Sequence, residues 1–255
     1  MTVGSLWLMP NSLDFGVATA SAPLDELLPL GAIRIAAGLE HWLCENAKTT
    51  RAFLKRVDAV CPLSRALQEL SIVELPRPSK GRSPATSTAE IGARLAPALA
   101  GHDLGLLSEA GLPALADPGS EVVAAAHAAG LPVRSLPGAS AIALAVAASG
   151  MNGQSFAFVG YVPVASNERA VRIRELEAIS RHAQQTQLLI ETPYRNAALL
   201  EALLTHLGPQ TRLSVSVGLT LPGGFTRSDA VAGWRRQPRV VPNDWPAVFS
   251  FLAPR

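Results

Sequence analysis

Short apolar runs that end in turn residues alternate with longer segments of helical periodicity in the first part of this chain. The runs have the length and composition of strands, and they lie at residues 5–9, 32–37, 103–107 and 132–136. Apolar side chains at helical spacing predict helices at 39–57 and 87–101, the second opened by Ser87 or Thr88 with Glu90 close behind. Strands that alternate with helices pair in parallel through right-handed crossovers. The pattern therefore predicts an α/β domain over about the first 150 residues.

A second alternation of strands and helices begins near residue 151. Strands are predicted within residues 155–163, 186–193, 211–224 and 247–253, and helices within 168–183 and 195–208. An apolar helix over 140–149 ends before them, and the small turn residues of 148–154 are typical of a linker. We therefore expect two α/β domains, residues 1–148 and 154–255, with a cleft between them. Clefts between domains are favoured ligand sites.

Composition narrows the class of protein. Hydrophobic residues make up 48% of the 255 residues and charged residues 16%, which predicts a sizeable core and excludes general disorder. The net charge of +2 does not by itself indicate nucleic acid, but arginine is much commoner than lysine and binds phosphate well. No apolar run has the length of a membrane span, and the start SLWLMP is too short for a signal peptide. A cytoplasmic, reduced protein with no membrane partner is expected.

Cysteine and histidine show no metal-binding pattern. Cys44 and Cys61 lie outside any CxxC motif, and the histidines are scattered singly along the chain, so no metal is expected. The Pro/Ser-rich segment 76–84 is predicted to be a flexible loop.

The segment SEAGLPALADPG, residues 108–119, combines two Gly/Pro turns with two carboxylates. It follows the predicted strand 103–107 and precedes an apolar helix, for which Asp117 is the expected N-cap and Pro118 the first helical residue. A strand, a Gly-containing loop and a capped helix form half of a βαβ unit, in which ligands bind at the carboxyl ends of the strands. This loop is therefore our first candidate for a binding site.

Other predicted strands end in comparable loops. LPGASA, residues 136–141, opens a helix whose expected N-cap is Ser140, and Gly111 and Gly138 would let a ligand lie directly on the backbone. The strand ends of the second domain carry Gly160, Tyr161, Glu191, Thr192, Pro193, Leu219 and Thr220. Each of these segments is also an ordinary turn, and the stronger signal is their recurrence at matching strand ends.

These motifs resemble those of the tetrapyrrole methylase superfamily of S-adenosylmethionine-dependent methyltransferases. The resemblance rests on SEAGLPALADPG, LPGASAIALAVAASG, SFAFVGYVP and IETPYR in that order, and it is strong from about residue 103 to 204. The motifs look most like those of the branch that contains the small-subunit ribosomal RNA (cytidine-2′-O)-methyltransferase. The resemblance implies a two-domain α/β fold with S-adenosylmethionine in the cleft between the domains, and a homodimer.

The resemblance also implies which residues hold the cofactor, largely through their backbone. Those of the first domain are Pro10, Ser108, Glu109, Ala110, Gly111, Pro113, Asp117, Pro118, Pro137, Gly138, Ala139 and Ser140. Those of the second domain are Phe158, Gly160, Tyr161, Glu191, Thr192, Leu219, Thr220, Pro246 and Ala247. Neither a metal nor a nicotinamide cofactor is implied.

Three segments depart from the patterns of the family. The RNA branch carries A-E-D-T-R-H-T-R where this chain has CENAKTTR, so that Glu45, Thr50 and Arg51 match while Asn46 and Lys48 replace Asp and Arg. Its first strand ends in T-P-I-G-N-L, whereas here Pro-Asn-Ser follows without the glycine. The Gly-rich loop G-x-G-P-G-D of the tetrapyrrole enzymes is not found either. This chain also ends soon after its last strand, where RNA-branch enzymes commonly carry a helical extension.

Candidate catalytic groups come from the CENAK segment. A ribose hydroxyl is a poor nucleophile, and a base or a cation near the developing oxyanion would activate it. Glu45 and Lys48 can fill these roles if the segment begins a helix that faces the cleft. Alternatively, both are solvated helix residues that form local pairs.

Arginines provide two candidate contacts for RNA. Four arginines of the predicted helix 168–183 are interleaved with glutamates, which is also typical of a solvated face. Trp234 lies beside Arg235, Arg236 and Arg239, an arrangement that suits base stacking next to phosphate contacts, although a tryptophan that anchors a loop is commoner. Three functions stay open: a methyltransferase that acts on RNA, a methyltransferase for a tetrapyrrole-like or other small molecule, and a protein that binds S-adenosylmethionine without catalysis.

Overall fold

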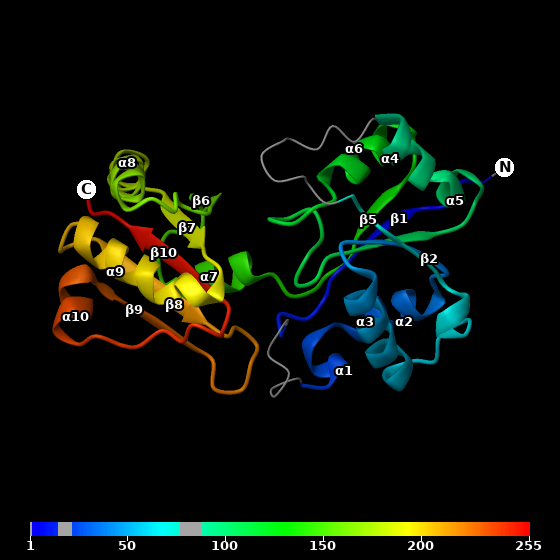
Figure 1. Cartoon of the computed structure of the whole chain (residues 1–255), viewed down its shortest axis with the longest axis horizontal. Helices are drawn as coiled ribbons and strands as arrows, with labels where there is room; N and C mark the ends of the chain where they lie inside the picture. Colours follow the sequence, from blue (N-terminus) through cyan, green and yellow to red (C-terminus); the bar gives the residue numbers. More distant parts are fainter. Residues whose placement is uncertain (1, 15–21, 77–87) are drawn as a thin grey trace. The chain divides into compact units, whose positions relative to one another are not determined.

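The computed structural model describes residues 2–14, 22–76 and 88–255, so most of the loop predicted at 76–84 lies outside the described residues. The chain forms two compact units, one that ends at Ala139 and one that begins at Ser140 (Figure 1). Each unit has its own five-stranded sheet with helices packed on it. The expected α/β fold class is confirmed.

In the first unit every strand pairing is parallel, as predicted, and the strand order is β3-β2-β4-β1-β5. The strands are β1 (Leu6–Met9), β2 (His41–Cys44), β3 (Ser71–Glu74), β4 (Leu104–Leu107) and β5 (Val133–Ser135). The helices are α1 (Leu24–Leu27), α2 (Leu30–Gly38), α3 (Ala47–Val60), the 3-10 helix η1 (Leu67–Glu69), α4 (Thr88–Arg94), α5 (Ala96–Leu99) and α6 (Ser120–Ala128).

Helices cover both faces of this sheet (Figure 1). On one face α2 and α3 pack with Trp42 and Met9, and Phe53 of α3 meets Trp42 edge to face. On the other face α4 and α6 contribute to a cluster that includes Val122 and Leu106. Because the strands are parallel, all of their carboxyl ends lie at one edge of the sheet.

The structure corrects the strand predicted at 32–37, which belongs to helix α2. Pro29 occupies the N-cap position, and Ala32, Ile33 and Ala36 recur toward the core at helical spacing. A short run of apolar residues does not by itself distinguish a buried helix from a strand.

The helix predicted at 39–57 is wrong in its first part, which is strand β2. This strand is buried between β3 and β4, where an apolar run fits either structure. Helix α3 begins only after Asn46, whose side chain accepts hydrogen bonds from the N–H groups of Lys48 and Thr49 at 2.9 and 3.4 Å. The mostly exposed edge strand β3 has no counterpart in the prediction.

The N-cap predicted for α6 is also wrong. The helix begins at Ser120, and its N-cap is Gly119, which has a φ of 129°. The N–H of Ala114 donates to the Pro118 carbonyl at 3.3 Å, and Ala116 has a φ of 68°. These features hold the residues before Gly119 in a turn, so Asp117 does not cap the helix and Pro118 does not begin it.

The helix predicted at 87–101 forms two short helices, α4 and α5. The first begins at Thr88, whereas Ser87 lies outside the described residues. Leu95 separates the two helices, and Pro97 lies in the first turn of α5, where its missing N–H is tolerated.

The second unit has a mixed sheet of order β6-β7-β10-β8-β9, in which β6 and β7 are parallel and β10 is antiparallel to β7 and β8. Its strands are β6 (Phe156–Gly160), β7 (Thr186–Ile190), β8 (Arg212–Val217), β9 (Phe225–Ala230) and β10 (Ala247–Leu252). Its helices are α7 (Ala141–Ser149), α8 (Ser166–Ala183), the 3-10 helix η2 (Pro193–Arg195), α9 (Asn196–His206) and α10 (Val231–Arg236).

Helix α7 packs on the sheet of the second unit, where Ile142 and Val146 meet Leu188 and Val248. Helices α8, α9 and α10 pack with the opposite face and its core of Leu, Val and Phe side chains. The division between the units therefore falls before α7, at Ser140, whereas the pattern of the sequence places a linker at 148–154.

Strand β9 and helix α10 were not predicted. The sequence FTRSDA of β9 has little apolar alternation, and the strand forms through pairing with β8 from Phe225 to Ala230. The strand predicted within 211–224 ends at Val217, because a turn with a hydrogen bond from Leu221 N–H to the Gly218 carbonyl follows.

Candidate functional site

The parallel sheet of the first unit brings together most of the first-domain residues expected to hold the cofactor. Pro10 follows β1, Glu45 follows β2, Ser108 follows β4 and Pro137 lies just beyond β5. Strand β4 lies between β2 and β1, so the loop 108–119 leaves the middle of this edge. This edge is the candidate site of the first unit.

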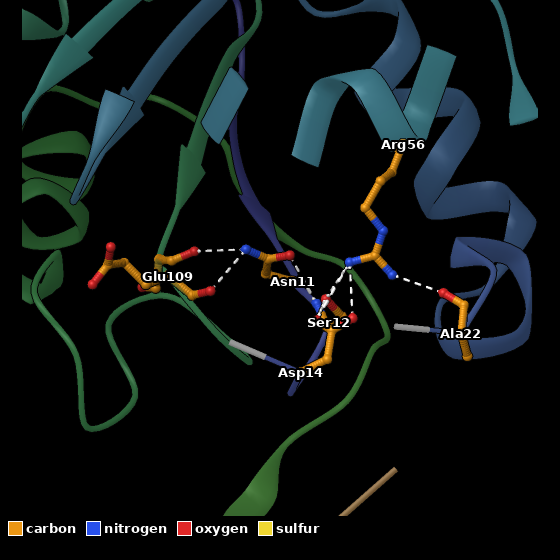
Figure 2. Close-up of polar contacts among 7 residues, drawn as sticks. Asn11, Ser12, Asp14, Ala22, Arg56 and Glu109 are labelled. Atoms are coloured by element: carbon orange, nitrogen blue, oxygen red, sulfur yellow. Dashed lines mark hydrogen bonds and ion pairs between the residues drawn. The ribbon is translucent and has the colours of Figure 1, made fainter. Parts of the chain in front are cut away.

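Asn11 joins the loop after β1 to the loop after β4 (Figure 2). Its N–H donates to the Gly111 carbonyl at 2.8 Å and its carbonyl accepts from Gly111 N–H at 3.2 Å. Its side-chain amide donates to the carbonyl oxygens of Ser108 and Glu109 at 3.1 and 3.0 Å. Asn11 lies in the Pro-Asn-Ser segment that departs from the motif of the RNA branch, and no pattern in the sequence indicates its role.

Arg56 of α3 fastens the same β1 loop (Figure 2). Its guanidinium donates to Ser12 Oγ at 2.9 Å, forms an ion pair with Asp14 at 3.1 Å and donates to the Ala22 carbonyl at 2.9 Å. Ser12 Oγ also donates to the Asp14 carboxylate. The Asp14 side chain is largely buried, so the pair is shielded from solvent more than a surface ion pair.

The loop 108–119 contains several residues with left-handed backbone. Gly111 has a φ of 69°, Ala114 of 63° and Ala116 of 68°. Alanine avoids this region because its Cβ approaches the carbonyl oxygen, so such residues persist where the surroundings impose them. Backbone strain of this kind is concentrated at ligand-binding loops, which favours a functional role for this one.

Ser108 places a hydroxyl group at the start of this loop. The residue is 3% exposed, and its Oγ has no hydrogen-bond partner among the described residues. A buried hydroxyl without a partner is unfavourable by about 1–3 kcal/mol. The Ser108 hydroxyl therefore keeps an unused hydrogen-bonding capacity at the start of the candidate loop.

Three carboxyl groups lie in the first unit near this edge: those of Glu109 and Asp117 in the loop 108–119, and that of Glu45 after β2. The N–H of Glu109 donates to Glu45 Oε2 at 3.3 Å. Burial, followed by the negative charges of Glu45 and Glu109, raises the pKa of Asp117 from 3.8 to about 7. Asp117 and the first turn of α6 line a pocket of about 310 Å³ together with Pro76. The cluster would attract a positively charged ligand.

The CENAK segment begins a helix, which is one of the two conditions of the catalytic hypothesis. Glu45 is half-buried directly after β2, and Lys48 is exposed in the first turn of α3. The N–H of Ala47 is bound by the Glu74 carboxylate at 2.7 Å. Glu45 thus contacts the candidate loop through Glu109, whereas Lys48 is accessible to a substrate from solvent.

Gly138 is needed for packing within the first unit. A Cβ at this position would lie 2.2 Å from Pro10 Cβ, so the two expected site residues are in direct contact. Ala139 is the last residue of this unit. Ser140 caps helix α7 as predicted, because its Oγ accepts from Ala143 N–H at 3.4 Å.

The expected residues of the second unit also share one edge of their sheet. Gly160 ends β6, Glu191 follows β7 and Leu219 follows β8, while Ala247 begins the antiparallel strand β10 between β7 and β8. The remaining members of the set lie beside these positions: Phe158, Tyr161, Thr192, Thr220 and Pro246. Gly160 with a φ of 71° and Thr220 with 70° give this edge two left-handed residues.

Glu191 is occupied by contacts within its own segment. It is 7% exposed, its Oε1 accepts from the Thr192 N–H at 2.9 Å and its Oε2 pairs with Arg195 at 3.1 Å. It shapes the turn before α9. Tyr161, by contrast, is 61% exposed and lies at the end of β6.

Trp234 cannot stack on a base as suggested from the sequence. It is fully buried, its indole N–H donates to the Leu213 carbonyl at 2.8 Å, and Arg227 lies over its ring. Arg235 instead donates to the carbonyl oxygens of Leu204 and Leu207 near the end of α9. The commoner alternative, a tryptophan that anchors the fold, is the correct one.

Over residues 2–14, 22–76 and 88–255, no group of three or more His, Cys, Asp or Glu side chains is arranged to hold a metal ion. Within the same ranges, no helix is long and apolar enough to cross a membrane.

The two α/β units and the loops at their strand ends are those expected of the S-adenosylmethionine-dependent methyltransferases that the motifs resemble. Residues 23–226 match the family model of the Tetrapyrrole (Corrin/Porphyrin) Methylases. This chain belongs to that family, and the resemblance carried by its motifs is confirmed.

Its relatives include proteins named Ribosomal RNA small subunit methyltransferase I. The protein of Mesorhizobium japonicum is 28% identical over 221 residues, which cover 86% of this chain and 68% of the relative. That of Synechocystis is 36% identical over 49% of this chain and 44% of the relative. The protein of Vibrio cholerae is 34% identical, and the match covers 48% of this chain and 41% of the relative. The chain thus matches less than half of the last two relatives.

Solved structures with the same fold have lower sequence identity. Uroporphyrin-III-C-methyltransferase of Thermus thermophilus has a TM-score of 0.52 and 21% identity, and the match covers 98% of this chain and 94% of that one. A putative cobalamin synthesis related protein of Corynebacterium diphtheriae has a TM-score of 0.57 and 15% identity, with full coverage of both chains. These similarities establish the fold.

Proposed function

We propose that this chain transfers a methyl group from S-adenosylmethionine to RNA, with a ribose hydroxyl as the acceptor. Family membership supports the cofactor, and the names of the relatives support ribosomal RNA of the small subunit as the substrate. The observation that carries the cofactor site is the edge of the first sheet, where the loop 108–119 combines left-handed backbone with the unpartnered Ser108 hydroxyl.

The residues of this edge fit the cofactor. When bound, S-adenosylmethionine supplies an electrophilic methyl group on a positively charged sulfur. Ser108 offers a hydroxyl that can donate or accept a hydrogen bond, whereas the N–H and carbonyl of Gly111 are both bonded to Asn11 and hold the loop in place. The negative charges of Glu45 and Glu109, which raise the pKa of Asp117, also favour a cation over a neutral ligand.

Glu45 and Lys48 are the proposed catalytic groups. Glu45 would accept the proton of the acceptor hydroxyl, and the ammonium of Lys48 would stabilise the oxygen as negative charge develops. Both residues flank the start of α3, so one short segment supplies both groups. We expect Lys48→Ala and Glu45→Gln to lower kcat by at least about 100-fold, since positioned acid–base groups contribute that much.

The remaining expectations extend this proposal. The strand-end residues of the second unit are candidate cofactor contacts, and the family resemblance implies a homodimer. An enzyme that modifies ribosomal RNA would act in the cytoplasm. Light scattering of the purified protein should give about twice the mass of 26.7 kDa, and a mass of one chain would contradict the dimer.

Calorimetric titration with S-adenosylmethionine and S-adenosylhomocysteine tests the cofactor site. We expect Ser108→Ala to bind about 5–10-fold more weakly than the wild type, as loss of one hydrogen bond predicts, with an unchanged or higher Tm because no protein contact is lost. Ser214→Ala is the matched control, since Ser214 Oγ is also buried without a partner but lies within strand β8. If Ser108→Ala binds the cofactor as tightly as Ser214→Ala does, the cofactor binds at another site.

Transfer of a labelled methyl group to small-subunit ribosomal RNA tests the acceptor. The modified nucleoside, identified by mass spectrometry, should carry the label on its ribose. Binding of the cofactor without transfer to RNA would favour a non-catalytic protein, and transfer to a tetrapyrrole instead would favour the small-molecule alternative.

A further inference from the structure

Asn11 connects the loop after β1 with the loop after β4 through its side chain. It lies outside the four motifs that carry the family resemblance. It is 6% exposed, and Figure 2 shows its amide directed toward Glu109. Both donors of the amide are used on main-chain carbonyls, those of Ser108 and Glu109. Its carbonyl oxygen accepts from Ser12 N–H at 2.8 Å.

These hydrogen bonds lie just beyond the point at which two neighbouring strands stop pairing. Strands β1 and β4 are parallel neighbours whose pairing ends at Met9 and Leu107. Beyond that point the two loops leave the sheet, and Asn11 continues the connection through a two-way bridge to Gly111 and its side-chain bonds. The loop from Ser108 to Gly111 is therefore held at both ends by one residue.

Asn11 is itself held in place from helix α3. Arg56 bonds to Ser12 and Asp14, one and three residues after Asn11, and α3 is packed against the sheet through Phe53 and Leu54. The connection runs from a packed helix through Arg56 to the β1 loop, and from Asn11 to the candidate cofactor loop.

We propose that Asn11 is a positioning residue that keeps the backbone of 108–111 in the conformation that binds the cofactor, a role that rests on the proposed function. A loop that is ordered before binding loses less conformational entropy when the ligand arrives. Removal of the side chain leaves two carbonyl oxygens without donors and lets the loop populate other conformations. The effect falls on cofactor affinity, because Asn11 does not supply a reacting group.

The test compares the wild type with Asn11→Ala and Asn11→Asp. Asp is nearly the same size and keeps an acceptor for Ser12 N–H, but it places an oxygen where two carbonyl oxygens require a donor. We expect both variants to bind S-adenosylhomocysteine about 10-fold or more weakly. The KM for S-adenosylmethionine should rise similarly, while kcat at saturating cofactor changes less than about twofold, because only binding is affected.

Hydrogen exchange provides a readout that does not need the ligand. The amide of Gly111, bonded to Asn11 at 3.2 Å, should exchange faster in both variants than in the wild type. The matched control is Asn152→Ala: Asn152 also donates to a main-chain carbonyl, that of Gln184, but at the amino ends of β6 and β7. That variant should keep the wild-type affinity.

The outcomes separate this role from the proposed function. If the wild type binds the cofactor and both Asn11 variants bind it as tightly, the positioning role is overturned and the proposed function stands. Unchanged exchange at Gly111 also overturns the role. If the wild type binds no cofactor, the proposed function fails, and the positioning role fails with it.

Discussion

Asp117 shows how the environment of one side chain changes its chemistry. From the sequence it is a helix cap, but in the structure it is partly buried in the first unit, and the charges of Glu45 and Glu109 act on it. Both burial and these charges favour the protonated carboxyl, so its pKa rises to about 7. Because the folded state disfavours the ionised carboxyl, the free energy of unfolding depends on pH.

We expect Asp117→Asn to be more stable relative to the wild type at pH 8 than at pH 5. In the wild type the folded carboxyl has a pKa of about 7, above the ordinary value of 3.8. The folded state binds the proton more tightly than the unfolded state, so stability is greatest below pH 3.8 and is lost as the pH rises toward about 7. Asp117→Asn has no carboxyl to ionise at this position, so its stability does not fall in this way as the pH rises.

Urea unfolding at the two pH values measures the difference. The variant of an exposed carboxyl, Asp244→Asn, controls for the general effect of removing a negative charge. A stability difference between wild type and Asp117→Asn that stays constant from pH 5 to 8 would contradict the raised pKa.

Replacement of Thr220 tests whether the left-handed backbone at this strand end contributes to cofactor binding. It is β-branched and has a φ of 70°, so Thr220→Gly should stabilise the fold by about 1 kcal/mol. If the strained turn helps to hold the cofactor, the same change should weaken S-adenosylhomocysteine binding several-fold. Gln184→Gly gives similar relief at the end of α8, where φ is 49°, and should leave binding unchanged. Thermal unfolding and calorimetry decide the matter, and unchanged binding in Thr220→Gly would remove Thr220 from the site.

Helix α3 carries residues of the candidate site and of the core. Lys48 is in its first turn, Arg56 bonds to the β1 loop, and Phe53 is buried against the sheet. Its start is set by Asn46, the residue that replaces the Asp of the RNA-branch motif. Asparagine and aspartate cap helices about equally well, so this departure preserves the local structure. Asn46 thus supplies an N-cap to α3 at the position where the motif has Asp.

Removal of the cap should destabilise α3 without affecting its packing. We expect Asn46→Ala to lower the free energy of unfolding by about 1 kcal/mol, since two N–H groups lose their acceptor. Asn46→Asp should retain the stability, and its negative charge at the helix N-terminus is favourable. Chemical denaturation of the three proteins tests this, and equal stability of Ala and Asn would show that the cap contributes nothing.

The whole chain has a net charge of only +2, and part of its arginine is committed to internal contacts. Arg56 and Arg195 form ion pairs with shielded carboxylates, and Arg235 binds main-chain carbonyls. On helix α8, Arg172 and Arg181 face glutamates of the same helix. Among the described residues these five arginines are engaged in internal contacts, which reduces the number of arginines readily available to phosphate groups.

We therefore expect binding to small-subunit ribosomal RNA to depend moderately on salt. Proteins with 6–10 phosphate contacts lose about 10³–10⁵ in affinity between 50 and 200 mM salt, and this chain should lose less than about 10³. Filter binding across that range measures the slope. A loss of 10⁴ or more would mean that many more arginines contact phosphate than their internal bonds allow.

Local patterns were sufficient for the elements with a clear period or an unambiguous turn. The strands β1, β4, β7 and β10 and the helices α7, α8 and α9 coincide with predicted segments. Prediction failed at 32–37 and in the first part of 39–57, where short apolar runs fit either structure, and at β9, which has no strong period and depends on pairing with β8. Candidate residues at strand ends could be identified because parallel strands align their loops at one edge.

The order of motifs along the chain was enough to establish the α/β class, the family and the loops in which a cofactor site should be sought, because these depend on residues that are close in sequence. The roles of Asn11, Arg56 and Asp117 depend on the folded chain. Asn11 and Ser108 are 97 residues apart, and only the pairing of β1 with β4 brings them within hydrogen-bond distance. Burial and charge at Asp117 likewise come from segments that folding assembles, and periodicity along the chain carries no information about such distant partners.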